Sequence, residues 1–265
     1  MSETTTVESQ KSALAGIPPR PSVWTTTGTL LRWSFSSIGA MLPLFVVVQA
    51  ALAAGIILGF GFLIPDIDTA TAQFLSTGAP TVLLMVIGLV IVPQGVAQAR
   101  TNGTFTYQRA LPVARWQLLV TNLTVWMVVA LPGIPVALSV AQLRYGFSYS
   151  FDWPLLVAAA VLATLMASAV GYAIGATFPP MLSQLVSQVL VFFVLLFSPI
   201  TFVASQLPDW FQSLHDVLPF RPAGDLIRAG LLSDTHSANG QDLVVLGVWC
   251  VLGLVVSVRA LVRRA

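Results

Sequence analysis

Charged residues are scarce in this 265-residue chain. Only 8% of its residues are Asp, Glu, Lys or Arg, and 56% are hydrophobic, whereas a soluble domain carries about 25% charged residues. This composition excludes an ordinary soluble globular domain. Several long tracts contain no charge and supply the roughly 20 apolar residues that a spanning helix needs. The sequence therefore predicts an all-α polytopic membrane protein.

Lysine and cysteine each occur once. A P-loop needs a lysine because this side chain and the backbone amides of the loop hold the phosphates, and the only lysine, Lys11, lies in a polar N-terminal stretch. The chain therefore cannot bind ATP through a P-loop. Cys250 lies in the last hydrophobic tract, which excludes a disulfide within one chain and a cysteine metal site. We expect this chain to bind no metal or other cofactor.

Carboxylates and histidines are absent from the interior of the hydrophobic tracts. Ion-coupled carriers keep such groups within their spans as ion sites, so a secondary carrier is disfavoured and remains only an alternative. An intramembrane enzyme is a weaker alternative, which would need His215, Asp216, Asp209 and His236 to form an acid/base or metal cluster. Asp209 and Asp216 are expected on the solvent face of a helix, so we assign no catalytic residue.

The hydrophobic tracts predict six transmembrane helices. The longest tract, from Trp153 to Pro208, is long enough for two spans, with Pro179 and Pro180 as the turn between them. Residues 1–20 are polar and predict a disordered cytoplasmic tail, and residues 21–265 form a single transmembrane domain. The predicted spans cover about 40–63, 79–99, 117–141, 154–177, 181–203 and 242–259.

The basic residues predict the orientation of the chain. Nine of the twelve lysines and arginines lie before the first span, between the second and third spans, or after the sixth span. Loops rich in lysine and arginine stay on the cytoplasmic side. Both termini and the loop between the second and third spans are therefore expected in the cytoplasm.

Aromatic and small residues predict two further features of the helices. Residues 21–41 combine Trp24 and Trp33 with small polar residues, which predicts an interfacial helix, or alternatively a frayed extension of the first span. Small residues recur at four-residue spacing in the fourth span, at Ala163, Ala167, Gly171 and Gly175. This spacing favours close packing within one subunit over a dimer face.

The loop between the second and third spans, RTNGTFTYQRALPVARW (100–116), is short and basic. We expect Thr104 to cap a helix that runs from Phe105 to Leu111, because Pro112 disfavours the helical conformation of the residue before it. A helix of about two turns is not stable alone in water. It must therefore dock on something, and Phe105, Tyr107 and Arg109 are the side chains expected to be most available to a partner.

Uncharged polar groups within the predicted spans suggest a substrate path. Gln184 and Gln188 share one face of the fifth span, and Asn122 lies in the third. With Phe192 and Phe193 they would line a path for an amphipathic substrate. Hydrogen bonding between helices is an equally good interpretation of these amides.

The loop from about 204 to 241 is the only long segment on the outer side. Pro208 and Asp209 begin a predicted helix with Trp210, Phe211, Leu214 and Val217 on one face, which suits the outer membrane interface. A second short helix is expected in PAGDLIRAGLL (222–232). The loop is thus expected to form two half-buried helices, with Trp210, Phe211 and Leu214 as an external gate.

The loop RTNGTFTYQRALPVARWQLL, with Gly103-Thr104, Leu111-Pro112-Val113 and Arg115, resembles the cytoplasmic loop of ABC-2 type transporter permeases. That family includes drug exporters of the daunorubicin-resistance type and exporters of polysaccharides and lipid-linked substrates. The stretch after the fifth span is also similar to its counterpart in the family. The matching positions there are Ser198-Pro199-Ile200, Leu207-Pro208-Asp209-Trp210 and Leu218-Pro219.

The resemblance implies a bacterial plasma-membrane subunit with six spans, an N-terminal connecting helix, a coupling helix and a re-entrant external hairpin. Two such subunits, as a homodimer or with a related paralogue, pair with two separate ATP-binding subunits, which hold ATP and Mg, to export a hydrophobic or amphipathic substrate. The resemblance also implies contact with the lipid bilayer, and it implies no nucleic-acid partner. Coupling would fall to Thr104, Phe105, Tyr107, Arg109 and Leu111.

One departure from the family lies just before Gly103-Thr104. Members commonly carry acidic residues there, whereas this chain has Arg100, Thr101 and Asn102. The charge pairing of relatives therefore does not carry over to this chain. The difference suggests that its ATP-binding subunit presents a different, acidic groove.

Overall fold

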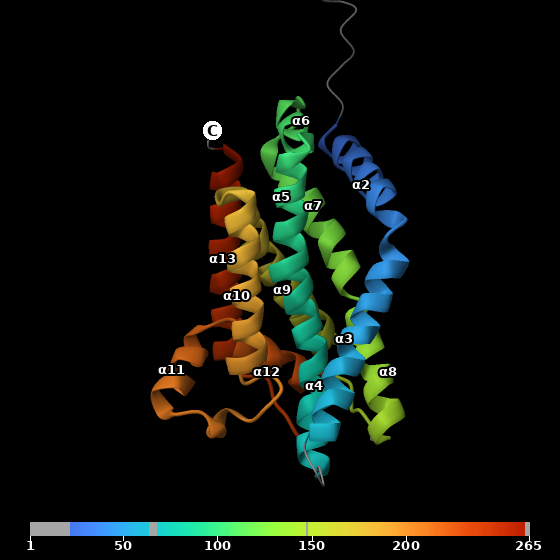
Figure 1. Cartoon of the computed structure of the whole chain (residues 1–265), viewed down its shortest axis with the longest axis vertical. Helices are drawn as coiled ribbons and strands as arrows, with labels where there is room; N and C mark the ends of the chain where they lie inside the picture. The colour runs from blue at the N-terminus through green and yellow to red at the C-terminus, as the bar shows by residue number, and fades with distance from the viewer. Residues whose placement is uncertain (1–21, 64–67, 147, 263–265) are drawn as a thin grey trace, which may run out of the picture.

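The structure is an all-helical bundle (Figure 1). It is a computed structural model that describes residues 22–63, 68–146 and 148–262, apart from the side chain of Arg109. Within these residues the backbone forms helices and a single isolated bridge, between Ser150 and Leu232, with no sheet. The predicted all-α fold is confirmed, while the predicted tail 1–20 lies outside the described residues.

Six helical segments of the described chain are long and apolar enough to cross a membrane, as predicted. Three of them lie close to their predicted bounds. These are α3 (Leu42–Leu63), α9 (Trp153–Thr177) and α13 (Gly240–Val262), the first, fourth and sixth spans.

The second span is longer than predicted. It runs without interruption through α4 (Thr69–Val86), the π-helical turn η1 (Ile87–Ile91) and α5 (Val92–Thr101). Its first part contains many small and polar residues, and a hydrophobicity criterion therefore missed it. Several of these residues, including Ala72, Ser76 and Thr77, are buried, and a segment enclosed by protein does not need an apolar surface.

The third and fifth spans also differ from prediction. The third is divided into α7 (Arg115–Ala130) and α8 (Gly133–Tyr145), which are separated at Leu131 and Pro132. The fifth, α10 (Pro180–Phe197), ends well before the predicted 203. Pro199 explains this end, because a proline disfavours the helical conformation of the residue before it, and Ser198 has an extended ψ of 131°.

A separate helix, α2 (Val23–Gly39), precedes the first span, from which it is divided by a turn at Ala40 and Met41. The Ser22 side chain caps it by accepting from the amide of Thr25 at 3.2 Å. The structure thus favours a distinct helix over a frayed extension of the span. Its side chains include the exposed Trp24 and Trp33.

Glycines allow the second and fourth spans to touch backbone to backbone. A Cβ added at Gly171 of α9 would lie 1.9 Å from the carbonyl oxygen of Gly88 in η1, and one at Gly175 would lie 2.9 Å from that of Pro93. Ala167 and Ala163 are fully buried on the same helix. The small residues of the fourth span therefore pack within this chain, as the favoured interpretation required.

Short helices lie at both ends of the bundle (Figure 1). One end carries α6 (Thr104–Ala110), the start of α2 and the end of α13. The other end carries α11 (Asp209–Val217) and α12 (Phe220–Leu231), beside α4. We refer to these as the α6 end and the α12 end. The segment between α10 and α13 contains η2 (Ala204–Gln206), α11 (Asp209–Val217) and α12 (Phe220–Leu231).

Candidate functional site

Helix α6 is seven residues long and begins differently from the prediction. Gly103, with a φ of 78°, is the residue before the helix, and Thr104 is already its first residue. The Asn102 side chain accepts from the Thr104 amide at 3.2 Å, in place of a cap by Thr104 itself. A positive φ costs glycine little, so the Asn102-Gly103 pair turns the chain sharply out of α5. The helix ends before Leu111, whose ψ of 141° is extended as expected ahead of Pro112.

The side chains of α6 divide into an inner and an outer set. Phe105 is 8% exposed and belongs to the main hydrophobic core, so the expectation that it is available to a partner is wrong. Tyr107 is 61% exposed. With Leu111 it lines a groove of about 290 Å³ whose other wall is α2, at Thr29, Leu30 and Trp33. Helix α6 is thus anchored by a phenyl ring and presents a tyrosine.

Two arginines of the same loop bind the ends of other spans. The Arg100 guanidinium donates to the carbonyl oxygens of Gly175 at 2.9 Å and Phe178 at 2.5 Å, at the end of α9. Arg115 donates to the carbonyl oxygen of Leu261, near the end of α13. The last carbonyls of a helix lack intrahelical partners and carry partial negative charge. These arginines therefore join the segments on either side of α6 to the fourth and sixth spans, in addition to any effect on the orientation of the chain in the membrane.

The predicted substrate-path residues do not all lie together. Gln184, Gln188 and Phe192 follow one another at four-residue spacing on α10 and are exposed. Phe193 is partly buried. Its ring faces α11 and α12 and lies near the rings of Phe211 and Phe220. Asn122 lies on α7 and donates to the carbonyl oxygen of Leu118 on its own helix. The structure thus gives an outward-facing row on α10 and leaves Asn122 outside it.

The amide of Gln49 fits the other interpretation, hydrogen bonding between helices. The Gln49 side chain of α3 is buried and donates to the carbonyl oxygen of Val129 on α7 at 2.8 Å. This is a hydrogen bond between spans. Gln184 and Gln188 are exposed on α10 instead.

At the α12 end, helix α11 shows two different faces. Trp210 is 70% exposed, and Leu214 and Val217 are exposed beside it. Phe211 faces inward, and its ring lies 4.6 Å from that of the fully buried His215. The predicted single face of Trp210, Phe211, Leu214 and Val217 is therefore wrong for Phe211. The remaining three form an apolar surface, while His215 stacks on Phe193 of α10 at 5.7 Å.

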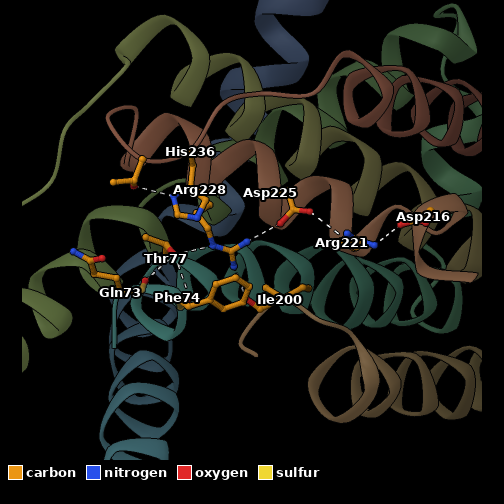
Figure 2. A network of polar contacts seen from close by, with 10 residues as sticks. Gln73, Phe74, Thr77, Ile200, Asp216, Arg221, Asp225, Arg228 and His236 are labelled. Carbon is orange, nitrogen blue, oxygen red and sulfur yellow. Dashed lines mark hydrogen bonds and ion pairs between the residues drawn. The ribbon is translucent and has the colours of Figure 1, made fainter. Parts of the chain in front are cut away.

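Helix α12 holds a buried arginine, one of the three basic residues that lie outside the segments predicted to be cytoplasmic. Arg228 is 1% exposed. As Figure 2 shows, its guanidinium donates to the Asp225 carboxylate at 2.6 Å, to the Thr77 hydroxyl at 3.2 Å and to the Ile200 carbonyl oxygen at 2.8 Å. The ring of Phe74 lies 3.5 Å below it. Burial lowers the pKa of Arg228 to about 10, and Asp225 opposes this change. Arg228 therefore stays charged at neutral pH.

The ion pairs continue from Arg228 toward the surface (Figure 2). Arg221 pairs with Asp225 at 3.4 Å and also with Asp216. These residues line a polar cavity of about 320 Å³, with His236 and Asp242 among the other lining residues. Burial and then the charge of Arg228 lower the pKa of His236 below its usual value, so its neutral form is favoured.

Only two of the groups proposed for an enzyme or a metal site, Asp216 and His236, line the same cavity. His215 lies in the aromatic cluster, whereas His236 faces the polar cavity. Among residues 22–63, 68–146 and 148–262, no three His, Cys, Asp or Glu side chains are grouped closely enough to hold a metal ion. Asp242 lies in the first turn of α13, which begins slightly before the predicted span.

The chain was compared with models of known protein families. Residues 66–259 match the sequence model of a family described as ABC-2 family transporter protein. This match covers most of the chain and includes α6, α10, α11 and α12. Comparison with curated proteins gives no match.

Proposed function

Because this chain belongs to the ABC-2 family of transporter proteins, and is thus a multi-pass membrane permease of an ABC transporter, we propose that it exports its substrate on ATP hydrolysis by a separate subunit. ATP and Mg would bind that subunit, and a second permease chain would complete the transporter. We further propose the bacterial plasma membrane as its location. The observation that carries the proposal is α6, a short helix fastened beneath the second span with Tyr107 exposed.

The fastening of α6 supports a role in transmitting force. Phe105 anchors it in the core, and Arg100 and Arg115 join its flanks to the ends of α9 and α13. A force applied to the exposed side of α6 would therefore be transmitted to the second, fourth and sixth spans through direct contacts. We assign the contact with the ATP-binding subunit to Tyr107, Arg109 and Leu111, with Thr104 and Phe105 holding the helix in place.

Charge supports the assignment of the α6 end to the cytoplasm. Arg32, Arg100, Arg109, Arg115 and Arg259 belong to segments at that end. Arginine-rich loops stay on the cytoplasmic side during insertion. Under this proposal both termini are cytoplasmic, and the α12 end faces outward.

The exposed row on α10 supports a polar path. An amide that faces lipid leaves its hydrogen-bonding groups without partners, which is unfavourable in the hydrocarbon region. Gln184 and Gln188 are exposed in the single chain, so we propose that this face meets the second permease or a path between the two chains. Phe192 beside them suits a hydrophobic or amphipathic substrate. Asn122 is not part of this proposal.

The apolar surface of α11 supports contact with the outer membrane interface. Trp210 and Leu214 are exposed there, and tryptophan prefers the level of the lipid headgroups. Phe211 lies in the aromatic cluster that holds α11 against α10. We propose that α11 gates the outer end of the path, with Phe211 as its hinge contact.

A double substitution tests this proposal. Replacing Tyr107 and Arg109 with alanine should leave expression and folding intact, but uncouple transport from ATP hydrolysis by the ATP-binding subunit. Both rates are measured in proteoliposomes that contain the co-purified complex. Leu143→Ala, at a position that is 89% exposed on α8, serves as the control and should behave like the unsubstituted protein.

Two outcomes would contradict the proposal. Normal coupled transport by the double variant would remove α6 from the mechanism. Transport that proceeds without any ATP-binding protein, driven by an ion gradient, would favour the secondary carrier instead.

A further inference from the structure

The buried Arg228 joins three segments that are far apart in the sequence. Thr77 and Phe74 belong to α4, Ile200 belongs to the connection after α10, and Asp225 lies on α12 with Arg228 itself. Figure 2 shows these groups around one guanidinium, with the Phe74 ring against its flat face. Each nitrogen of the side chain has a partner. Arginine suits such a position because its planar fork provides several donors in fixed directions.

The contact with α4 is tight as well as polar. Gly78 follows Thr77, and a Cβ added there would lie 2.2 Å from the carbonyl oxygen of Ile200. The connection after α10 therefore rests directly on the backbone of α4. Arg228 donates to the same carbonyl oxygen. The connection between α10 and α11 is therefore in direct backbone contact with the second span at Gly78, with no flexible side chain between them.

Stability alone is a poor explanation for this arginine. A buried ion pair loses hydration on folding, and its replacement by apolar residues of similar volume is often neutral or stabilising. Such a pair does fix one arrangement of the segments that it joins, because an unpaired buried charge is strongly unfavourable. Arg228 therefore specifies how α12 and the connection after α10 sit on α4.

Arg228 contacts α4, which is the first part of a long continuous helical span. α4, η1 and α5 form a single helical span of 33 residues, Thr69–Thr101, which at 1.5 Å per residue is about 50 Å long. α6 follows directly after Asn102 and Gly103 at its other end. The second span is therefore the shortest covalent route between α6 and the α12 end.

We propose that Arg228 is a positioning residue that links the outer helices to the second span, so that a displacement of α6 moves α11 and α12. This inference rests on the proposed function, in which α6 receives the force from the ATP-binding subunit. It adds that the outer helices move with the second span. The clasp formed by Arg228, Phe74, Thr77 and the Ile200 carbonyl is the connection that transmits the movement.

A labelling experiment tests the link. In a Cys250→Ser background, which removes the only cysteine, Ser213→Cys places a thiol at an exposed position on α11. Its rate of reaction with a water-soluble maleimide is measured in the proteoliposome complex, without nucleotide and with trapped ATP. We expect the two rates to differ at least threefold when Arg228 is present. In Arg228→Met the difference should fall below 1.5-fold, while ATP hydrolysis and complex formation persist.

Matched variants separate positioning from general stability. Arg228→Lys keeps the charge but lacks the planar guanidinium with its several fixed donors. It should therefore retain part of the nucleotide dependence that Arg228→Met loses. Arg221→Met removes the neighbouring arginine, which pairs with Asp216 and Asp225, and should leave the dependence unchanged. If Arg228→Met does not fold, the double variant Phe74→Leu/Thr77→Val loosens the clasp from the α4 side and should reduce the dependence in the same way.

The outcomes distinguish this inference from the proposed function. Unchanged nucleotide dependence in Arg228→Met, or in the double variant if the former does not fold, would overturn the link and leave the ATP-driven mechanism intact. If the protein with Arg228 shows no nucleotide dependence although the complex hydrolyses ATP, the movement of the outer helices is refuted. If no ATP-binding subunit is captured, both proposals fail.

Discussion

The guanidinium of Arg100, in the last turn of α5, donates to the carbonyl oxygen of Gly175, in the last turn of α9, at 2.9 Å. The same nitrogen also reaches the carbonyl oxygen of Phe178. One charged side chain therefore satisfies backbone groups that the end of α9 leaves without partners. This contact ties the loop before α6 to the fourth span.

Loss of that contact should destabilise the fold. Arg100→Met removes hydrogen bonds to the Gly175 and Phe178 carbonyl oxygens, the first partly buried and the second exposed. A hydrogen bond to a charged group contributes about 1.5–3 kcal/mol, and exposure to solvent weakens the second bond. We expect a loss of about 2 kcal/mol in the free energy of unfolding, measured by denaturant titration in detergent micelles. Arg144→Met is the control, because Arg144 is exposed and lies over the ring of Tyr145 in its own helix. Equal effects of the two substitutions would argue against the capping role.

A methyl group at the contact between the second and fourth spans should separate them. Gly171→Ala places a Cβ 1.9 Å from the Gly88 carbonyl oxygen, so the helices must move apart, at a cost of about 1–3 kcal/mol. Gly247→Ala, on the open side of α13 with nothing within 4 Å, should be neutral or stabilising by up to about 1 kcal/mol. Thermal unfolding of the two variants measures the difference. A Gly171→Ala protein as stable as the Gly247→Ala protein would show that the spans do not touch there.

The two faces of α6 should respond differently to alanine. Phe105→Ala removes a buried ring from the core and should cost about 3 kcal/mol in the free energy of unfolding. Tyr107→Ala changes an exposed side chain and should stay within about 0.5 kcal/mol. Circular dichroism during denaturant titration reports both values. The opposite ranking would mean that Tyr107, and not Phe105, anchors the helix.

The charge of Arg228 should be detectable at His236. The pKa of His236 lies below its ordinary 6.5, first because of burial and then because of repulsion by Arg228. The folded protein therefore binds fewer protons than the unfolded chain between that lowered pKa and 6.5, so the free energy of unfolding rises with pH across this window and levels off above it.

In Arg228→Met the repulsion disappears, and Asp225, which raises the pKa of His236, loses one of its two arginine partners and keeps Arg221. The pKa of His236 should then rise, and the pH dependence of stability in that window should shrink. NMR titration of histidine-labelled protein measures the pKa directly, because the chain has only two histidines and His236→Gln assigns the signals. An unchanged pKa would place Arg228 too far from His236 to act on it.

Much of the fold was predictable because most spans face outward. α3, α10 and α13 expose many large apolar side chains, including Leu44, Val189 and Val251, and such helices must be apolar along their length. The first half of α4 was not predictable in this way. Ser76 and Thr77 are enclosed by other helices, and neither hydrophobicity nor charge marks a segment whose surroundings are protein.

The candidate site shows a similar division. The position of α6 followed from Gly103 and Pro112, which act on the local backbone. Which side of α6 is buried did not follow, because seven residues contain too few turns to define an apolar face. Arg228 was missed because Thr77 and Ile200 lie 151 and 28 residues away from it. Its neighbours at Gly224, Ile227 and Leu231 do place it on the apolar side of α12, and that pattern would have indicated burial.

The π-helical turn at Ile87–Ile91 determines how the second span tolerates a change in its length. A turn of this kind accommodates one residue more than a regular α-helix, while the flanking segments keep their rotational phase. Deleting one residue within Ile87–Ile91 would restore a regular helix and leave Thr77 and Arg100 facing their present partners. A deletion elsewhere in the span would rotate one end against the other by about 100°. The bulge is therefore the place where this span can lose a residue without changing the direction in which α6 leaves it.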